Sequence, residues 1–152
     1  MIFKYETIVR PEWIDYNGHM HDAYYSLVFS HAVDALQDEV GFDKQYRARS
    51  GCTIFLLEDH RFYLHEVYEG DHLGVETRVI DVDDKRFHLH LDMRRSGKSV
   101  ALCEFVELHV QRAPSPRACP MPDSIRAKLE NAMRCEQGKF SLRKRSRTLS
   151  LR

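Results

Sequence analysis

The feature that most constrains this chain is a change in the spacing of its apolar residues, from a helical period over residues 22–40 to a two-residue period after residue 52. Apolar side chains in the first segment recur three or four positions apart, as they do along one face of an amphipathic helix. They are Tyr25, Phe29, Ala32, Leu36 and Val40. Asp22 is a suitable N-cap for this helix, and Gly41 is a suitable stop. The pattern therefore predicts one long helix in the body of the chain.

Extended segments surround this helix. Alternation of apolar and polar residues predicts strands over 2–10, 52–67, 71–81, 86–95 and 99–111, with turn formers at 69–71, 83–85 and 96–98. Residues 43–51 are predicted to be a polar connection, and residues 123–135 a short C-terminal helix. An amphipathic helix needs an apolar partner surface, which long strand faces can supply. The sequence thus predicts an α+β fold in which a long antiparallel sheet of about five strands wraps around one central helix.

Chain length limits the number of domains, and net charge limits the kinds of partner that the protein can attract. With 152 residues, 43% of them hydrophobic, the chain suits a single globular domain. Its formal net charge is zero, which gives the whole molecule no electrostatic attraction to nucleic acid. Six basic and no acidic residues lie in 139–152, so we divide the chain into a domain of residues 1–138 and a basic tail of residues 139–152. A solvated terminus is the simplest interpretation of the tail, and a patch for an anionic partner is the alternative.

The cysteine and histidine residues predict neither disulfides nor a bound metal. The four cysteines form no C-x-x-C pair, and the N-terminal stretch is typical of a strand rather than a signal peptide. No segment is apolar enough to span a membrane, so we expect a reduced, cytoplasmic protein without membrane partners. Histidines pair at 19/21 and at 88/90, yet no further ligand follows at a recognised zinc spacing. No metal and no cofactor are therefore expected.

Chemically capable side chains concentrate in residues 13–25, where a loop enters the helix. Amides in the first turn of a helix have no intrahelical partner and carry partial positive charge, so they can hold a developing oxyanion. A carboxylate such as Asp15 can act on a carbonyl as base or nucleophile, and Gly18 permits a sharp turn between the two. Structural interpretations remain open beside this one: Asp15, Asn17 and Gly18 as turn formers, His19 as a core histidine, and Tyr24 and Tyr25 as packing residues.

One motif in this stretch carries a family resemblance. The sequence W-x-D-Y-N-G-H-M, with a tyrosine ten residues after the aspartate, resembles the signature D-x-x-G-H-[VM]-x-x-x-x-Y of the 4-hydroxybenzoyl-CoA thioesterase-like hotdog family. The matching residues are Asp15, Gly18, His19, Met20 and Tyr25, and the likeness extends over about residues 3–112. The resemblance implies a hotdog fold and hydrolysis of a short or polar acyl-CoA. Coenzyme A would then be part of the substrate and not a cofactor.

The same resemblance implies where the chemistry lies. Asp15 would be the catalytic carboxylate, attacking the thioester or activating water, and amides near residues 21–24 would hold the oxyanion. Two subunits would join edge to edge in a homodimer, or further into a tetramer, with each active site at the subunit interface. The residues expected to contact the substrate or the oxyanion are Asn17, Gly18, His19, His21, Asp22, Ala23, Tyr24, Tyr25, Glu58, His60 and Tyr63.

Two features of the sequence bear on the substrate. His21 stands where many members of the family have asparagine, so we expect it to orient water or the thioester carbonyl, or to narrow the choice of substrate. Glu58, His60 and Tyr63 form an E-x-H-x-x-Y pattern that is expected to reach across the interface, or else to lie in solvent. Stretches 11–42 and 58–71 are also similar to thioesterases that act on betainyl-CoA in carnitine breakdown. A quaternary ammonium would suit Glu58 and nearby tyrosines.

Two other functions compete with hydrolysis. Hydratases and dehydratases of enoyl thioesters share the fold, but their D-x-N-x-x-H pattern is one residue longer than the spacing from Asp15 to His19, and their usual proline is missing. A hotdog module that binds acyl-CoA without turnover is the other alternative. Such regulators normally carry a DNA-binding region, whereas only the tail of this chain is basic. Asp15 favours hydrolysis, because a pure binder needs no carboxylate beside the thioester.

Overall fold

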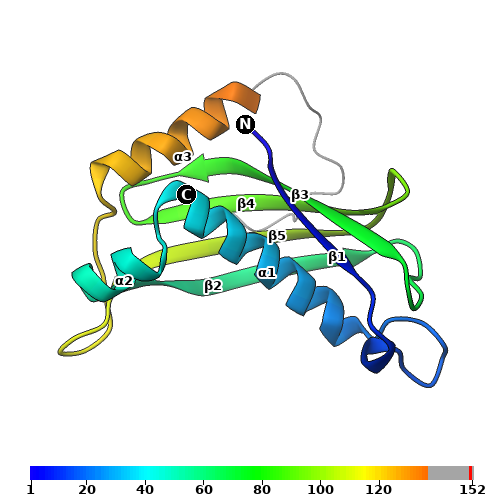
Figure 1. Ribbon diagram of the computed structural model, residues 1–152. Coiled ribbons are helices and arrows are strands. Elements are labelled where there is room, and N and C mark those ends of the chain that lie inside the picture. Colours follow the sequence, from blue (N-terminus) through cyan, green and yellow to red (C-terminus); the bar gives the residue numbers. More distant parts are fainter. Residues whose placement is uncertain (137–150, 152) are drawn as a thin grey trace.

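A computed structural model of the chain, which describes residues 1–136 and residue 151, has a curled antiparallel sheet with one long helix across a face (Figure 1). The strands are β1 (Phe3–Ile8), β2 (Cys52–Tyr63), β3 (His72–Val82), β4 (Arg86–Arg95), β5 (Lys98–Gln111) and the two-residue β6 (Arg117–Ala118). Their order is β1-β3-β4-β5-β2, and β6 pairs with the end of β5. β1 and β2 are therefore the edge strands. The predicted architecture, a sheet of about five long strands around one helix, is confirmed.

The long helix is α1 (Asp22–Val40), and its apolar stripe faces the core as predicted. All five stripe residues are buried, and they share the core with Phe87, Leu89 and Leu91 of β4. Gly41 ends the helix with φ 115°, a left-handed conformation that glycine adopts without a steric penalty. The predicted N-cap is wrong. Asp22 is already helical, and His21 is the cap instead, because its Nδ1 accepts a hydrogen bond from the Ala23 amide at 3.1 Å.

The predicted polar connection at residues 43–51 is also wrong, since it contains the helix α2 (Lys44–Ser50). None of its residues is buried, so the sequence offers no apolar period by which to recognise it. Its ends are defined by caps. The Asp43 carboxylate accepts a hydrogen bond from the Tyr46 amide at 2.7 Å, and Gly51 closes the helix with φ 68°.

The ends of several elements differ from the prediction. β2 stops at Tyr63 rather than at residue 67, because the amides of Leu64 and His65 both bond to the Val100 carbonyl and the ladder cannot continue. β1 is shorter at both ends, and a 3-10 helix, η1 (Pro11–Trp13), follows it. The short strand β6 was not predicted. The C-terminal helix, α3 (Asp123–Glu136), was predicted, and Figure 1 shows it beside β3.

Little of the basic tail lies within the described residues. Leu151 is described: it packs against Val106 of β5, and its carbonyl accepts a hydrogen bond from Arg86 at 2.8 Å. The prediction of a solvated tail otherwise falls outside the described residues, as does the domain boundary at residue 138. In the described part, no helix combines the length and the apolar character needed to cross a membrane.

Candidate active site

The loop before α1 is folded into a tight hairpin that displays Asp15. Ile14 and Met20 form an isolated bridge, and the Asp15 amide bonds to the His19 carbonyl at 3.1 Å. Gly18 closes the turn with φ 81°, in the left-handed region that favours glycine, and its amide bonds to the Asp15 carbonyl at 3.0 Å. The hairpin is tied to the 64–71 connection by the Met20 amide, which donates to the Val67 carbonyl at 2.7 Å. These bonds hold Asp15 beside the start of α1.

A cleft of about 450 Å³ lies between this hairpin, the start of α1 and the end of β2. Its lining residues are Asp15, Tyr16, Asn17, His19, Met20, His21, Asp22, Tyr25, Tyr63, Leu64, His65 and Glu66. Most of the residues expected at the site are therefore gathered in one place, including the proposed catalytic carboxylate. Gly18, Ala23 and Tyr24 shape the loop and the helix start without lining the cleft.

The Asp15 carboxylate is held by its neighbour Asn17. Its Oδ1 accepts a hydrogen bond from the Asn17 amide at 2.7 Å, and its Oδ2 accepts a longer one, 3.4 Å, from the Asn17 side chain. Asp15 is therefore the turn former that the sequence allowed. The two roles are compatible, because an ionised carboxylate offers about four lone-pair sites and these bonds use two of them. The side chain is half-buried at the cleft, where a reacting group could meet it.

His21 makes two contacts that need opposite protonation states of the same nitrogen. Its Nδ1 accepts a hydrogen bond from the Ala23 amide, which requires a lone pair on that atom. The same Nδ1 lies 2.8 Å from Asp22 Oδ1, a contact that is favourable when Nδ1 carries a proton. When Nδ1 offers its lone pair, His21 therefore caps α1, and when Nδ1 carries a hydrogen it donates to Asp22 and no longer accepts from the Ala23 amide. That amide is one of those expected to hold an oxyanion.

Aromatic rings form the inner wall of the cleft. Tyr25 and Tyr63, which both line it, meet edge to face with centroids 5.2 Å apart, and outside the cleft lining Trp13 stacks on Tyr24 at 5.5 Å. Burial, followed by the negative charge of Glu66, raises the pKa of Tyr25 to about 12. Burial also raises the pKa of Tyr63. Both rings therefore remain neutral phenols near neutral pH, and Tyr63 is the more exposed of the two.

Glu58 and His60 do not line this cleft. They pair across the ladder with Val106 and Glu104 of β5, so they share one face of the sheet, as their spacing predicted. Arg61, on the other face of β2, bonds to Ser26 of α1, which shows that Glu58 and His60 point away from the helix. Within one chain they are thus separated from Asp15. Their predicted approach to the substrate of a partner subunit stays a prediction.

Sequence reasoning missed the contribution of residues 64–66. The apolar pattern placed them inside a strand, whereas the chain leaves the ladder at Tyr63 and turns under the helix start, bringing Leu64, His65 and Glu66 to the cleft. Glu66 adds a third carboxylate to those of Asp15 and Asp22, and none of the described lining residues is a lysine or arginine. The cleft is therefore acidic and aromatic.

The fold and the site define the class of protein. Residues 9–129 match the model of the thioesterase-like superfamily, which covers most of the chain. The chain belongs to this superfamily, and the family resemblance noted from the Asp15 motif is confirmed. The predicted class of reaction, thioester hydrolysis, agrees with this membership.

Individual relatives within the superfamily are also similar to this chain. The chain is 47% identical to the betainyl-CoA thioesterase of Pseudomonas aeruginosa strain PAO1, an alignment that covers 86% of this chain and 82% of the relative. It is 38% identical to the L-carnitine dehydrogenase/betainyl-CoA thioesterase of Agrobacterium fabrum over 88% of this chain, which spans only 28% of that longer protein. Among solved structures, the Staphylococcus aureus protein SAV2348, in complex with CoA, superposes with a TM-score of 0.84 at 30% identity, covering 88% of this chain and 85% of the other.

Proposed function

We propose that this chain hydrolyses betainyl-CoA, with Asp15 as the catalytic carboxylate. The observation that carries the proposal is the composition of the cleft, which joins the carboxylates of Asp15, Asp22 and Glu66 to the rings of Tyr25 and Tyr63. Carboxylates attract a quaternary ammonium, and aromatic faces within about 6 Å of it contribute roughly 0.5–2 kcal/mol. The relatives from Pseudomonas aeruginosa and Agrobacterium fabrum, both named for betainyl-CoA, support the same substrate.

The reaction needs an attacking group, a place for negative charge and a leaving thiol. Asp15 either takes a proton from a water molecule that attacks the thioester carbonyl, or attacks that carbonyl itself to give an anhydride that water then cleaves. The carbonyl oxygen gains negative charge, which the amides at the start of α1 stabilise. The carbon–sulfur bond then breaks, and the thiolate of coenzyme A leaves and takes up a proton. When water is the attacking group, this step yields the free acid directly. When Asp15 attacks, this step yields the anhydride, which water afterwards cleaves to the free acid and the Asp15 carboxylate. The Ala23 amide can help to stabilise the charged oxygen when His21 releases it.

The test compares two substrates of equal shape. Betainyl-CoA and 3,3-dimethylbutyryl-CoA differ by a positively charged nitrogen in place of a carbon, so a thiol-release assay on both isolates the effect of the charge. We expect kcat/KM to be at least about tenfold higher for betainyl-CoA. Glu66→Gln should lower kcat/KM for betainyl-CoA about fivefold and should change kcat/KM for the neutral substrate by less than about twofold. Equal rates for both substrates would refute the cationic specificity, and binding of both without release of thiol would favour the non-catalytic alternative.

The proposal includes a homodimer formed through β2. This edge strand exposes three successive apolar residues, Phe55, Leu56 and Leu57, with 42%, 47% and 53% of their surfaces accessible. An exposed apolar edge is a template for pairing with another strand. Pairing two β2 strands would extend the sheet and cover these side chains, in the arrangement that the family resemblance implies.

A charged residue on the edge should prevent this pairing. Leu57→Lys is expected to give a monomer in light scattering after size-exclusion chromatography, and Ile8→Lys, at a similarly exposed position on the opposite edge strand β1, should leave the dimer intact. If the active site needs both subunits, Leu57→Lys will lose thioesterase activity and Ile8→Lys will keep it. A wild-type protein that is monomeric at micromolar concentration would overturn the dimer.

A further inference from the structure

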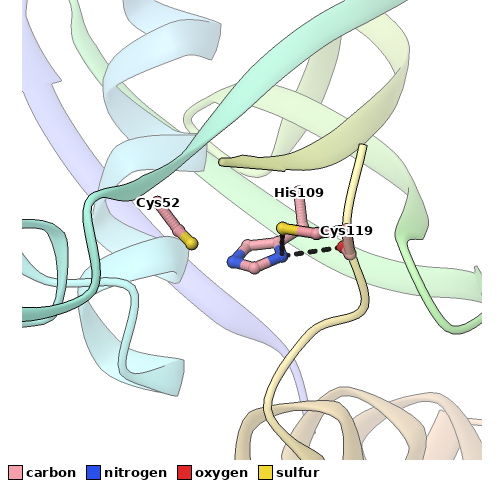
Figure 2. A group of neighbouring side chains, drawn as sticks. All are labelled: Cys52, His109 and Cys119. Atoms are coloured by element: carbon pink, nitrogen blue, oxygen red, sulfur yellow. Dashed lines mark hydrogen bonds between the residues drawn. The ribbon is translucent and has the colours of Figure 1, made fainter. Parts of the chain in front are cut away.

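Two cysteines and a histidine meet at the end of the sheet that lies farthest from Asp15. Cys52 opens β2, His109 lies near the end of β5, and Cys119 directly follows β6. The two sulfur atoms and a ring nitrogen of His109 all lie within 4.8 Å of one another (Figure 2). β2 is 12 residues long, so this cluster is roughly 35 Å from the active-site end of the strand.

The backbone holds these three residues in place. β2, which carries Cys52, and β6, which directly precedes Cys119, both pair with β5, which carries His109. The Cys119 amide also donates to the His109 carbonyl at 3.1 Å. Three segments are thus fixed against one another by main-chain hydrogen bonds, which makes their side chains a preorganised group rather than a chance contact.

The imidazole of His109 is oriented by groups around it. Its ring is buried and stacks on Phe42 with centroids 5.6 Å apart. Nε2 lies 2.7 Å from the Tyr46 hydroxyl. On the other side of the ring, Nδ1 faces Cys119, 3.4 Å from its Sγ and 2.9 Å from its carbonyl oxygen, and Figure 2 shows both of these contacts. A histidine that ligates a metal usually has its other nitrogen bonded to a partner of this kind.

We propose that Cys52, His109 and Cys119 form a zinc-binding site, with Tyr46 as the outer partner of the histidine. Zinc bonds of about 2.3 Å to sulfur and about 2.0–2.1 Å to nitrogen place tetrahedral ligand atoms about 3.6–3.8 Å apart, close to the 3.4 Å between Cys119 Sγ and His109 Nδ1. Two thiolates and an imidazole suit a borderline-soft cation, and water completes the tetrahedron. A metal here would join the start of β2 and the 112–119 connection to β5, and would therefore stabilise this end of the sheet.

Binding changes the protonation of all three ligands. Without metal, Nδ1–H donates to the Cys119 carbonyl and Nε2 accepts from Tyr46. With metal, Nδ1 gives its lone pair to zinc, Nε2 carries the proton and donates to the Tyr46 oxygen, and both thiols become thiolates. Two protons therefore leave for each Zn²⁺ bound, and no electron is transferred.

The test measures metal content and ligand identity in the full-length, reduced protein. After treatment with a chelator, we expect the chain to bind one Zn²⁺, and Co²⁺ in its place to show thiolate charge-transfer absorption. Cys52→Ser and Cys119→Ser should lose both properties. Cys135→Ser, which removes an exposed thiol on α3, is the matched control and should bind normally. Tyr46→Phe should weaken zinc binding about 10–100-fold.

Several results would overturn the site. These are a reduced wild-type chain that takes up no stoichiometric metal, an unchanged Co²⁺ spectrum in Cys119→Ser, or a Cys52–Cys119 disulfide in a protein that still binds no metal after reduction. The thioesterase assay separates this inference from the proposed function, because zinc removal should lower the melting temperature and leave kcat unchanged. The cysteine variants are partly exposed and nearly isosteric, so circular dichroism can confirm that they fold.

Discussion

The two ends of β2 are built in opposite ways. At its C-terminal end, the candidate active site draws most of its side chains from one continuous stretch, residues 13–25, folded into a hairpin and a helix start. At its N-terminal end, the Cys52–His109–Cys119 cluster draws its side chains from β2, from β5 and from the residue that directly follows β6. The first end is open, acidic and aromatic, and the second is closed around a buried imidazole.

We therefore expect the two ends of β2 to have different roles, one in the reaction and the other in the stability of the fold. The active-site end holds its carboxylate with local hydrogen bonds, so a substitution there should change the rate more than the stability. The cysteine end joins distant segments, so a substitution there should change the stability more than the rate.

The largest effect is expected from Asp15→Asn. Asparagine keeps the shape and can still accept the Asn17 amide, but it can neither take a proton nor attack a carbonyl, so kcat should fall by about 10²–10⁴-fold. The melting temperature should change little. Thiol release measured beside equilibrium binding of coenzyme A checks this, since binding should survive. A rate within threefold of the wild type would remove Asp15 from the mechanism.

The second-largest effect is expected on stability, from a substitution of Glu107. This residue lies on β5 and pairs with Leu56, between the two ends of β2. Burial, followed by the charge of Asp34, raises its pKa from 4.5 to about 7. The folded chain therefore binds more protons than the unfolded chain between these values, so this carboxyl lowers the free energy of unfolding as pH rises from 4.5 to 7. Glu107→Gln should stabilise the protein by about 2–3 kcal/mol at pH 8 and by nearly nothing at pH 4. Urea denaturation at both pH values measures this, and equal effects would contradict the assignment.

Two glycines give a matched comparison of the two ends. Gly18 and Gly51 have φ values of 81° and 68°, and an added Cβ would meet nothing within 4 Å at either position. Alanine should therefore cost each about 1–2 kcal/mol of stability, from the backbone alone. Only Gly18→Ala should also lower kcat/KM, about tenfold, because it displaces Asp15. Equal losses of activity in both variants would show that the rate depends on general stability rather than on the loop.

The smallest effect is expected from Tyr25→Phe. The hydroxyl makes a long bond of 3.4 Å to the His65 carbonyl, whereas the ring packs against Tyr63. Losing the hydroxyl should cost less than about 1 kcal/mol of stability and leave hydrolysis of betainyl-CoA within threefold. Tyr25→Leu, which removes the aromatic face, should reduce the preference for betainyl-CoA over its neutral isostere. A larger loss in the phenylalanine variant would assign the hydroxyl a role in the reaction.

Some helices, strands and caps could be predicted from the sequence, and others were found only in the structure. The stripe from Tyr25 to Val40 predicted α1 because its apolar side chains recur every three or four residues. The alternating apolar and polar residues of the later segments predicted the sheet. Helix α2 was missed because its seven residues bury nothing and so leave no period to detect. The cap at His21 was missed because an imidazole and a carboxylate can both accept an amide, and sequence alone does not say which residue stands just outside the helix.

The sequence by itself determined the family and the fold class, and it predicted Asp15 as the carboxylate of the site, because these depend on periodicity and on a motif whose residues are neighbours in the chain. Only the tertiary structure decided that Glu66 joins the cleft while Glu58 and His60 face away, and that Cys52, His109 and Cys119 meet. Such contacts depend on where a ladder ends and on strand register, and a shift of one residue would turn each side chain to the opposite face. That information lies in hydrogen bonds between distant segments, which no local pattern records.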